Sequence, residues 1–308
     1  MNAKRAGWAF LWMVVVFITA SILVSALLPD LSIGVTALFS ELCLLVPALV
    51  QLSKARAQVS EQLHLKGIRL STALMVLVYH VCCYPVILAM NSFTMAISDN
   101  TALDITDQFG DVSFFVMWFF VGLLGPVVEE LVFRGIILGG LRTTGRIFSA
   151  IVLSALLFGL AHMNINQFSY TLCVGIFWGL LVEATGSIVP SLICHVMMNS
   201  VSVMMAFLLE KSYGELDGMM EVSGMESAVS YLATGFFFLF ISIFTTMLAM
   251  LMLRVISLNE GRTGCFENIF RKKSRAERLG SLFSVPLIAG IAVSGFVTVF
   301  VFILNLLW

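Results

Sequence analysis

The chain has 308 residues, of which 60% are hydrophobic and 11% charged, and its formal net charge is −1. Its mean hydropathy is +1.03. A soluble domain is about half apolar and a quarter charged, so this composition excludes an ordinary soluble protein. Nothing in the charge balance indicates a nucleic-acid partner. The composition predicts an all-α, polytopic membrane helix bundle.

Nine apolar windows are long enough to be membrane spans, because a bilayer core about 30 Å thick needs roughly 20 apolar residues per helix. The first window follows Lys4 and Arg5, but its apolar run exceeds that of a signal peptide, so we expect an uncleaved span. We expect nine spans, with eight as the alternative count. The windows are 8–28, 32–52, 71–92, 113–140, 147–163, 168–183, 188–208, 228–256 and 281–308.

The distribution of basic residues predicts the orientation of these spans, because cytoplasmic loops carry an excess of Lys and Arg. With a cytoplasmic N-terminus and alternating sides, all but two of the 17 Lys and Arg residues fall in cytoplasmic segments. The exceptions are Arg134, inside the fourth window, and Lys211. We therefore expect an integral, multi-pass protein with its N-terminus inside, in the plasma membrane of a bacterium.

Two segments expected on the cytoplasmic side are rich in charged residues. Residues 53–70 mix charges with spaced apolar residues, which is typical of an interfacial helix or of a solvated linker. Residues 258–280 form a basic loop. We expect the whole chain, 1–308, to form one transmembrane domain that includes both segments.

The fourth window contains ionisable residues, which are costly in a membrane span. It reads GPVVEELVFRGIILGGLR and places Glu129, Glu130 and Arg134 on one helix. Glu130 and Arg134 are four residues apart, so they share a face and can pair. Glu129 lies about 100° around the helix, which leaves it free to face a cavity. Pro126 lacks an N–H and is expected to kink the helix beside this pair.

Two further windows add polar groups at one-turn spacing. Phe158 and His162 share a face of the fifth window, and His195 and Asn199 share a face of the seventh. Each pair alone is explained by interhelical packing, and we interpret the other ionisable span residues in this way: Glu41, His80 and Glu183. Packing does not require two carboxylates, two histidines and an amide together, so residues 113–208 are predicted to contain a functional site.

The motifs Glu-Glu-x-x-x-Arg (129–134), Phe-x-x-x-His (158–162) and His-x-x-x-Asn (195–199) resemble those of the CPBP intramembrane proteases (CAAX-protease and bacteriocin-processing, also called Abi). All three motifs match in order, on separate spans. The resemblance covers about residues 113–208, the expected catalytic core. It implies an intramembrane endopeptidase that acts on a peptide or membrane protein at the bilayer.

The resemblance also implies roles for the site residues. Glu129 is expected to activate a water molecule together with His162. His195 and Asn199 are expected to donate hydrogen bonds to the oxyanion. Glu130 and Arg134 are expected to hold the helix and orient Glu129, with Phe158 as a supporting residue.

The cofactor is left open by the sequence. Glu129, His162 and His195 can supply three ligands of a catalytic zinc ion. There is no HExxH pair on one helix, and the two histidines come from different spans, which slightly favours a metal-free glutamate mechanism.

The depth of the site predicts a long fourth helix. At about 1.5 Å per residue, Glu129 lies roughly 20 Å from Arg142, whereas His195 lies only about 10 Å from the start of its window. The depths agree if the last turns of the fourth helix lie outside the hydrocarbon.

Three functions remain as hypotheses. Beside the endopeptidase, which would process prenylated CAAX proteins or mature a peptide or bacteriocin, a non-enzymatic scaffold or immunity factor would have the same spans. A proton-coupled transporter is the third, but the chain shows no repeated halves. The oligomeric state is not indicated.

Overall fold

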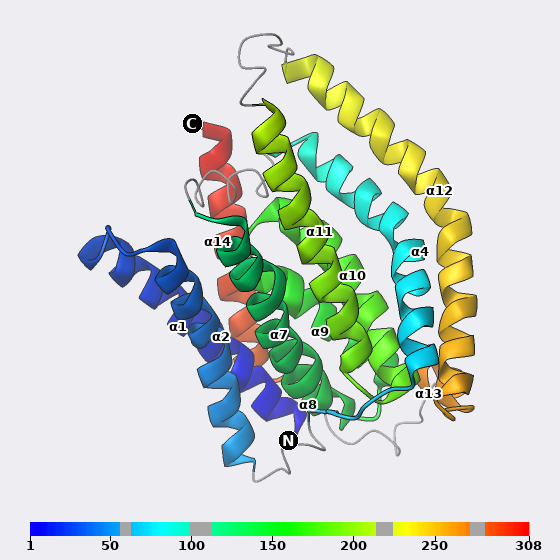
Figure 1. The fold of residues 1–308 in the computed structure, drawn as a ribbon. Coiled ribbons are helices and arrows are strands. Elements are labelled where there is room, and N and C mark those ends of the chain that lie inside the picture. Colours follow the sequence, from blue (N-terminus) through cyan, green and yellow to red (C-terminus); the bar gives the residue numbers. More distant parts are fainter. Residues whose placement is uncertain (56–62, 99–111, 214–223, 272–280, 308) are drawn as a thin grey trace.

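The structure is a computed structural model that describes residues 1–55, 63–98, 112–213, 224–271 and 281–307. All regular secondary structure in this part of the chain is helical. Figure 1 shows the helices as a bundle with most axes running along its long dimension.

Eight helices in the described residues are long and apolar enough to cross a membrane, so the chain is an integral multi-pass protein. One of them, Phe114–Arg142, is composite. The others are α1 (Ala3–Leu27), α2 (Ile33–Lys54), α4 (Leu70–Met95), α10 (Ile165–Thr185), α11 (Val189–Tyr213), α12 (Gly224–Asn259) and α14 (Val285–Leu307).

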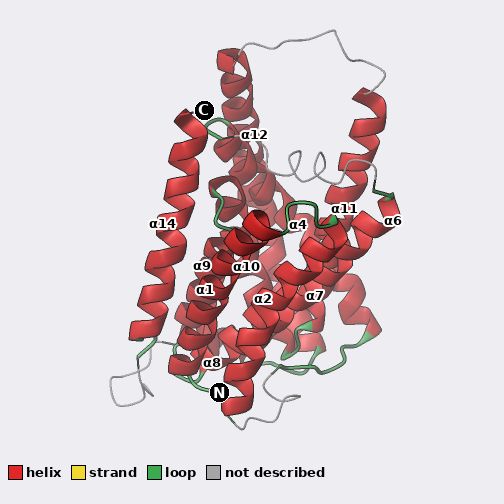
Figure 2. Ribbon diagram, turned by 90° about the vertical axis from the view of Figure 1, so that its left-hand side faces the viewer, coloured by secondary structure: helices red, strands yellow, loops and turns green. Residues whose placement is uncertain are grey.

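A ninth apolar helix, α9 (Ile147–Ala161), corresponds to the fifth predicted window but has only 15 residues. At 1.5 Å per residue it is about 22 Å long, which is shorter than the hydrocarbon core. The N- and C-termini lie at opposite ends of the bundle, which requires an odd number of traverses (Figures 1 and 2). Nine spans were expected, with eight as the alternative, and the described residues contain eight long apolar helices and one short one.

The fourth predicted span is one continuous helical run of 29 residues, Phe114–Arg142. Two π-helical segments, η1 (Trp118–Leu124) and η2 (Leu131–Leu138), alternate with three α-helical ones: α6 (Phe114–Met117), α7 (Gly125–Glu130) and α8 (Gly139–Arg142). Pro126, which has no N–H to donate, falls at the junction of η1 and α7. At α-helical rise this run would measure about 43 Å, so the predicted long helix is correct.

The core is centred on α10, which is the most enclosed of the long helices. Two thirds of its apolar window (67%) is buried, against 17% for α1 and α12, whose apolar side chains face outward as expected toward lipid. Close approach to α9 is possible because α10 has glycine at two contacts: a Cβ on Gly175 would lie 2.7 Å from Ala155 Cβ, and one on Gly179 would lie 2.7 Å from Ile151. Lipid supplies no hydrophobic driving force for helix association, so close packing at small residues holds such helices together.

The two segments that were expected on the cytoplasmic side are described only in part. Residues 56–62 of the 53–70 segment lie outside the described residues, and 63–69 are not helical, so an interfacial helix is wrong for that part. Leu63 is instead buried against Gly135 of η2, and the Lys66 carbonyl accepts a hydrogen bond from Ser187. In the basic segment 258–280, α12 continues to Asn259 and a short helix, α13 (Cys265–Phe270), follows, whereas 272–280 lie outside the described residues.

Candidate functional site

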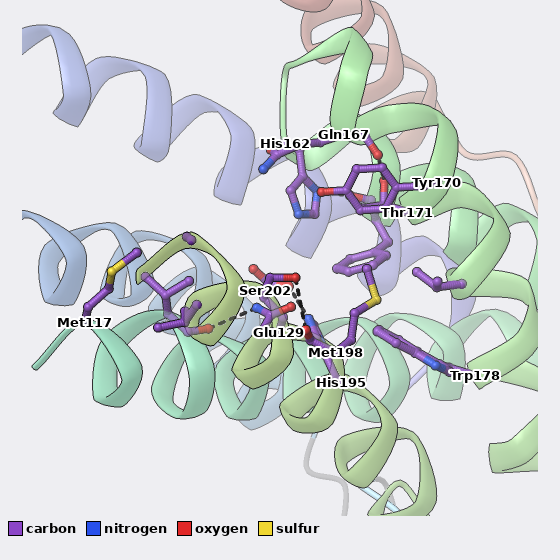
Figure 3. Close-up of a pocket in the computed structure, with 16 residues that line it drawn as sticks. Met117, Glu129, His162, Gln167, Tyr170, Thr171, Trp178, His195, Met198 and Ser202 are labelled. Atoms are coloured by element: carbon purple, nitrogen blue, oxygen red, sulfur yellow. Dashed lines mark hydrogen bonds and ion pairs between the residues drawn. The ribbon is translucent and has the colours of Figure 1, made fainter. Parts of the chain in front are cut away.

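The three motif-bearing helices and α10 surround one cavity of about 130 Å³ (Figure 3). All of its lining residues lie between Met117 and Ala206, within the core expected from the motifs. Five of the seven predicted site residues line it: Glu129, Phe158, His162, His195 and Asn199. Glu130 and Arg134 lie behind the wall, where their side chains are 0% and 2% exposed.

The Glu130–Arg134 pair expected from the four-residue spacing is present. Arg134 Nη1 lies 3.0 Å from Glu130 Oε1. Neither terminal guanidinium nitrogen has the alignment of a hydrogen bond, so the contact is an ion pair without directed bonding. The guanidinium carbon lies 4.2 Å from the centre of the Phe158 ring and 5.2 Å from that of Trp178. The two aromatic faces stabilise a cation that is otherwise out of reach of water.

His195 connects the two glutamates. Its Nδ1 lies 3.0 Å from Glu130 Oε1, and its Nε2 lies 3.5 Å from Glu129 Oε2. Figure 3 shows Glu129 and His195 facing each other at the cavity wall. The ring is held in this orientation by Trp178, whose ring centre is 4.5 Å away. Glu129 is 19% exposed, so it faces the cavity as predicted but has a histidine beside it.

Charge balance follows from this chain of contacts. With Glu129 and Glu130 ionised and with Arg134 and His195 protonated, the four groups sum to zero. A buried set of charges is tolerated when each charge has an opposite neighbour, which is the case here from Glu129 through to Arg134. The ring nitrogen of His195 that lies beside Glu129 is Nε2, at 3.5 Å from Oε2.

His162 is held by a backbone contact at the end of α9. Its Nδ1 lies 2.9 Å from the Phe158 carbonyl oxygen. A carbonyl can only accept, so Nδ1 carries the hydrogen, and in the neutral ring Nε2 is an acceptor. Because His162 lines the cavity, this acceptor is available to a molecule bound there.

Asn199 makes one contact with the composite helix. Its Nδ2 donates to the carbonyl of Val121, in η1, at 2.9 Å. An amide nitrogen carries two hydrogens, so one donor and the amide oxygen remain for the cavity. Val121 lies in a π-helical segment, where the hydrogen-bond ladder is irregular and a carbonyl is free to take a side-chain partner.

The cavity wall also contains α10 residues that were not predicted. Gln167, Tyr170, Thr171, Val174 and Trp178 line it. Their spacing of three, four, seven and eleven residues from Gln167 places them on one helical face. Polar and aromatic residues on one face of a membrane span are the signal that would have identified them.

The three ionisable residues interpreted as packing residues have different surroundings. Glu183 pairs with Arg142, and His80 packs against Tyr84 and Trp178; neither lines the cavity. Glu41 of α2 is closer to the site. One of its oxygens lies 3.3 Å from where a Cβ on Gly125 would be, and its carboxylate is near enough to Glu129 to interact electrostatically. Its Oε2 is buried without a hydrogen-bond partner among the described residues.

The three candidate zinc ligands, Glu129, His162 and His195, all line the cavity. No three His, Cys, Asp or Glu side chains among the described residues converge closely enough to hold a metal ion. Glu129 and His195 are adjacent, but His162 does not complete the set, and Nδ1 of His195 already contacts Glu130. The residues in this arrangement do not fit a three-ligand zinc site.

Comparison with known proteins identifies relatives of the region around the cavity. Residues 111–201 match the family model of type II CAAX prenyl endopeptidase Rce1-like proteins. The Bacillus subtilis (strain 168) protein named "Putative membrane peptidase YdiL" is 30% identical over 93 residues, which are 30% of this chain and 38% of that protein. No solved structure matches. The resemblance inferred from the three motifs is confirmed, and it covers the cavity-lining helices rather than the whole chain.

Proposed function

We propose that this protein is an intramembrane endopeptidase that hydrolyses a peptide bond of a membrane-associated peptide or protein. The observation that carries the proposal is the contact of Glu129 with His195 at the wall of a cavity enclosed by membrane-spanning helices. The match of residues 111–201 to a peptidase family supports the same reaction class.

Glu129 is the proposed general base. It is the only carboxylate among the residues that line the described cavity, and His162 lines the same cavity. A water molecule that enters the cavity can therefore meet both side chains. The Nε2 acceptor of His162 and the Glu129 carboxylate together orient the two hydrogens of this water. As Glu129 takes one proton, the water oxygen forms a bond to the scissile carbonyl carbon.

The later steps use the same groups. The carbonyl oxygen becomes an oxyanion, and the remaining N–H of Asn199, with the Nε2–H of protonated His195, is suited to stabilise it. The C–N bond then breaks, and the proton held by Glu129 passes to the leaving amine. Water is thereby divided between the new carboxyl and amino ends.

Glu130 and Arg134 act as positioning residues. Glu130 Oε1 accepts the Nδ1–H of His195 and thereby aims Nε2 at Glu129. Arg134 neutralises Glu130, which prevents two adjacent carboxylates from sharing a buried site uncompensated.

The substrate class is proposed from the lining of the cavity and the family description. Apart from the catalytic groups, much of the wall is apolar, with Met117, Val121, Val174, Met198, Val203 and Ala206. Such a wall accommodates aliphatic side chains on either side of a scissile bond. The matched family is described as prenyl endopeptidases of CAAX proteins. We therefore propose a lipid-anchored peptide with aliphatic residues as substrate.

The test is cleavage by the purified full-length protein in liposomes. A farnesylated peptide ending in Cys-aliphatic-aliphatic-X is compared with the same peptide without the lipid, and products are identified by mass spectrometry. We expect cleavage by the wild-type protein and a loss of roughly 10²- to 10⁴-fold in Glu129→Gln, because a general base contributes about that much.

Glu267→Gln is the matched control, since Glu267 is exposed on α13, and it should cleave at the wild-type rate. Undiminished cleavage by Glu129→Gln would remove the assigned base. A phenotype in cells that survives substitution of Glu129, His162 and His195 would instead favour a non-enzymatic scaffold or immunity factor.

A further inference from the structure

A second cavity, of about 450 Å³, lies between the start of α1 and the end of α2. It is outside the region that matches the peptidase family. Three cations line it: Lys4 and Arg5 from the first turns of α1, and Lys54 from the last turn of α2. Two indoles, Trp8 and Trp12, also line it.

The three cations have no counter-ion in the part of the chain that the structure describes, because none of the ion pairs there includes Lys4, Arg5 or Lys54. The positive end of the α1 dipole and the negative end of the α2 dipole both lie at the cavity and offset each other, so its positive charge comes from these side chains. The cavity therefore concentrates positive charge, which favours an anionic ligand.

A buried amide points to the same conclusion. Gln51 is 7% exposed and lines the cavity, yet no described residue forms a hydrogen bond with its side chain. Buried polar groups in folded proteins almost always have a partner. An amide that has none within the protein, and that faces a cavity, is expected to find one in a ligand or in water held there.

The place of the cavity in the fold indicates which anion it binds. Trp8 and Trp12 stack with ring centres 6.2 Å apart, and Trp12 is 47% exposed. Tryptophans at the end of a membrane span mark the level of the lipid headgroups. Next to the cavity, the same end of α2 exposes Val46 and Val50, at 50% and 42%, to the surroundings. A ligand at this site thus meets cations and an amide at one end and apolar surface at the other.

We propose that this cavity binds the headgroup of an anionic phospholipid, with its phosphate between Lys4, Arg5 and Lys54 and its acyl chains along α2. Gln51 supplies a hydrogen bond to a phosphate or glycerol oxygen. Basic pockets between spans on the cytoplasmic side are suited to such lipids. The site is independent of the proposed peptidase reaction, since none of its residues lines the catalytic cavity.

The experiment is native mass spectrometry of the full-length protein in detergent, titrated separately with phosphatidylglycerol, phosphatidylcholine of the same acyl chains, and inorganic phosphate. We expect phosphatidylglycerol to bind in preference to the other two. The triple variant Lys4→Gln/Arg5→Gln/Lys54→Gln should bind it about a hundredfold more weakly, at roughly fivefold for each cation removed. Lys66→Gln/Arg69→Gln/Arg254→Gln changes the net charge equally at other exposed positions and should bind as the wild type does.

A further variant separates the site from membrane topology, because Lys4 and Arg5 also contribute to orientation. Gln51→Leu keeps every charge and should weaken phosphatidylglycerol binding severalfold. Equal binding of the two lipids, equal loss in both triple variants, or equally tight binding of inorganic phosphate would each overturn the lipid site.

Discussion

Glu130 contacts both Arg134 and His195 through a single carboxylate oxygen. Oε1 lies 3.0 Å from both Arg134 Nη1 and His195 Nδ1 in a fully buried position. Its other oxygen has no hydrogen-bond partner among the described residues. The carboxylate therefore supplies charge to two neighbours at once.

Glu130→Gln is predicted to destabilise the protein by about 3–5 kcal/mol, because it leaves Arg134 buried without a counter-ion. The thermal unfolding midpoint in detergent measures this. The double variant Glu130→Gln/Arg134→Met should recover part of the loss, since an apolar residue of similar size does not require a counter-ion. An unchanged midpoint in Glu130→Gln would show that the ion pair contributes nothing to stability.

At the scale of helices, the close approach of α9 to α10 determines where His162, at the end of α9, lies relative to Tyr170 and Trp178 of α10 in the cavity wall. Gly175 allows this approach, because its missing Cβ would lie 2.9 Å from the Cα of Ala155 and 2.7 Å from its Cβ. Backbone atoms cannot yield as the end of a flexible side chain can, so an added methyl group forces the helices apart.

We predict that Gly175→Ala destabilises the protein by about 1–3 kcal/mol, the range for overpacking a tight core. Peptidase activity should also fall, because His162 follows α9 while α10 supplies Tyr170 and Trp178 to the wall of the same cavity. Gly295→Ala in α14 is the control: nothing lies within 4 Å of the added Cβ, so the unfolding midpoint should stay the same or rise. Equal midpoints in the two variants would contradict the packing argument.

The two π-helical segments change which residues share a face of the composite helix. The prediction that Glu129 and Glu130 diverge by about 100° assumes α-helical geometry, and α7 has it. The flanking segments η1 and η2 do not. Their extra residue per turn shifts the faces of the helix before and after the glutamates. Segments of this kind are found frequently at functional sites.

At the scale of the whole molecule, one cluster of charged side chains joins the ends of several helices. Arg142 Nε lies 2.5 Å from Glu183 Oε1, and Arg262 Nε donates to the Glu183 carbonyl at 2.8 Å. Arg142 also contacts His64 Nε2 at 3.0 Å, through the loop before α4. The cluster therefore links the composite helix, α10 and the segment after α12.

This cluster predicts a pH dependence of stability. Burial, with the positive charges of Arg142 and Arg262, lowers the pKa of His64 to about 4. An unfolded histidine takes up a proton near pH 6.5, so between about pH 6.5 and 4 the unfolded state binds more protons. The stability that His64 contributes in its neutral form is fully present above about pH 6.5 and is lost as the pH falls toward 4.

The check is the thermal midpoint of the wild type and of His64→Asn across this range. Asparagine tolerates the positive φ of 51° at this position, so the variant retains the backbone conformation. The midpoint of the wild type should fall more steeply between pH 6.5 and 4 than that of the variant. Parallel profiles would show that His64 does not titrate as its surroundings predict.

The amino-acid sequence alone determined the class of the protein, its spans and the Glu130–Arg134 pair. These depend on local terms: apolar residues over a bilayer's thickness, and a spacing that places two side chains on one helical turn. The short α9 was predicted in position but not in length, because its end depends on the turn that carries His162 into the cavity.

Only the tertiary structure decided which groups lie beside Glu129 and Glu130. His195 is 65 residues from Glu130 in the chain, and no local pattern says that its ring reaches both glutamates. The same holds for Trp178 beside that ring, for the bond from Asn199 to Val121, and for the cavity between α1 and α2. Each depends on how one helix packs against another, which no local pattern of residues specifies.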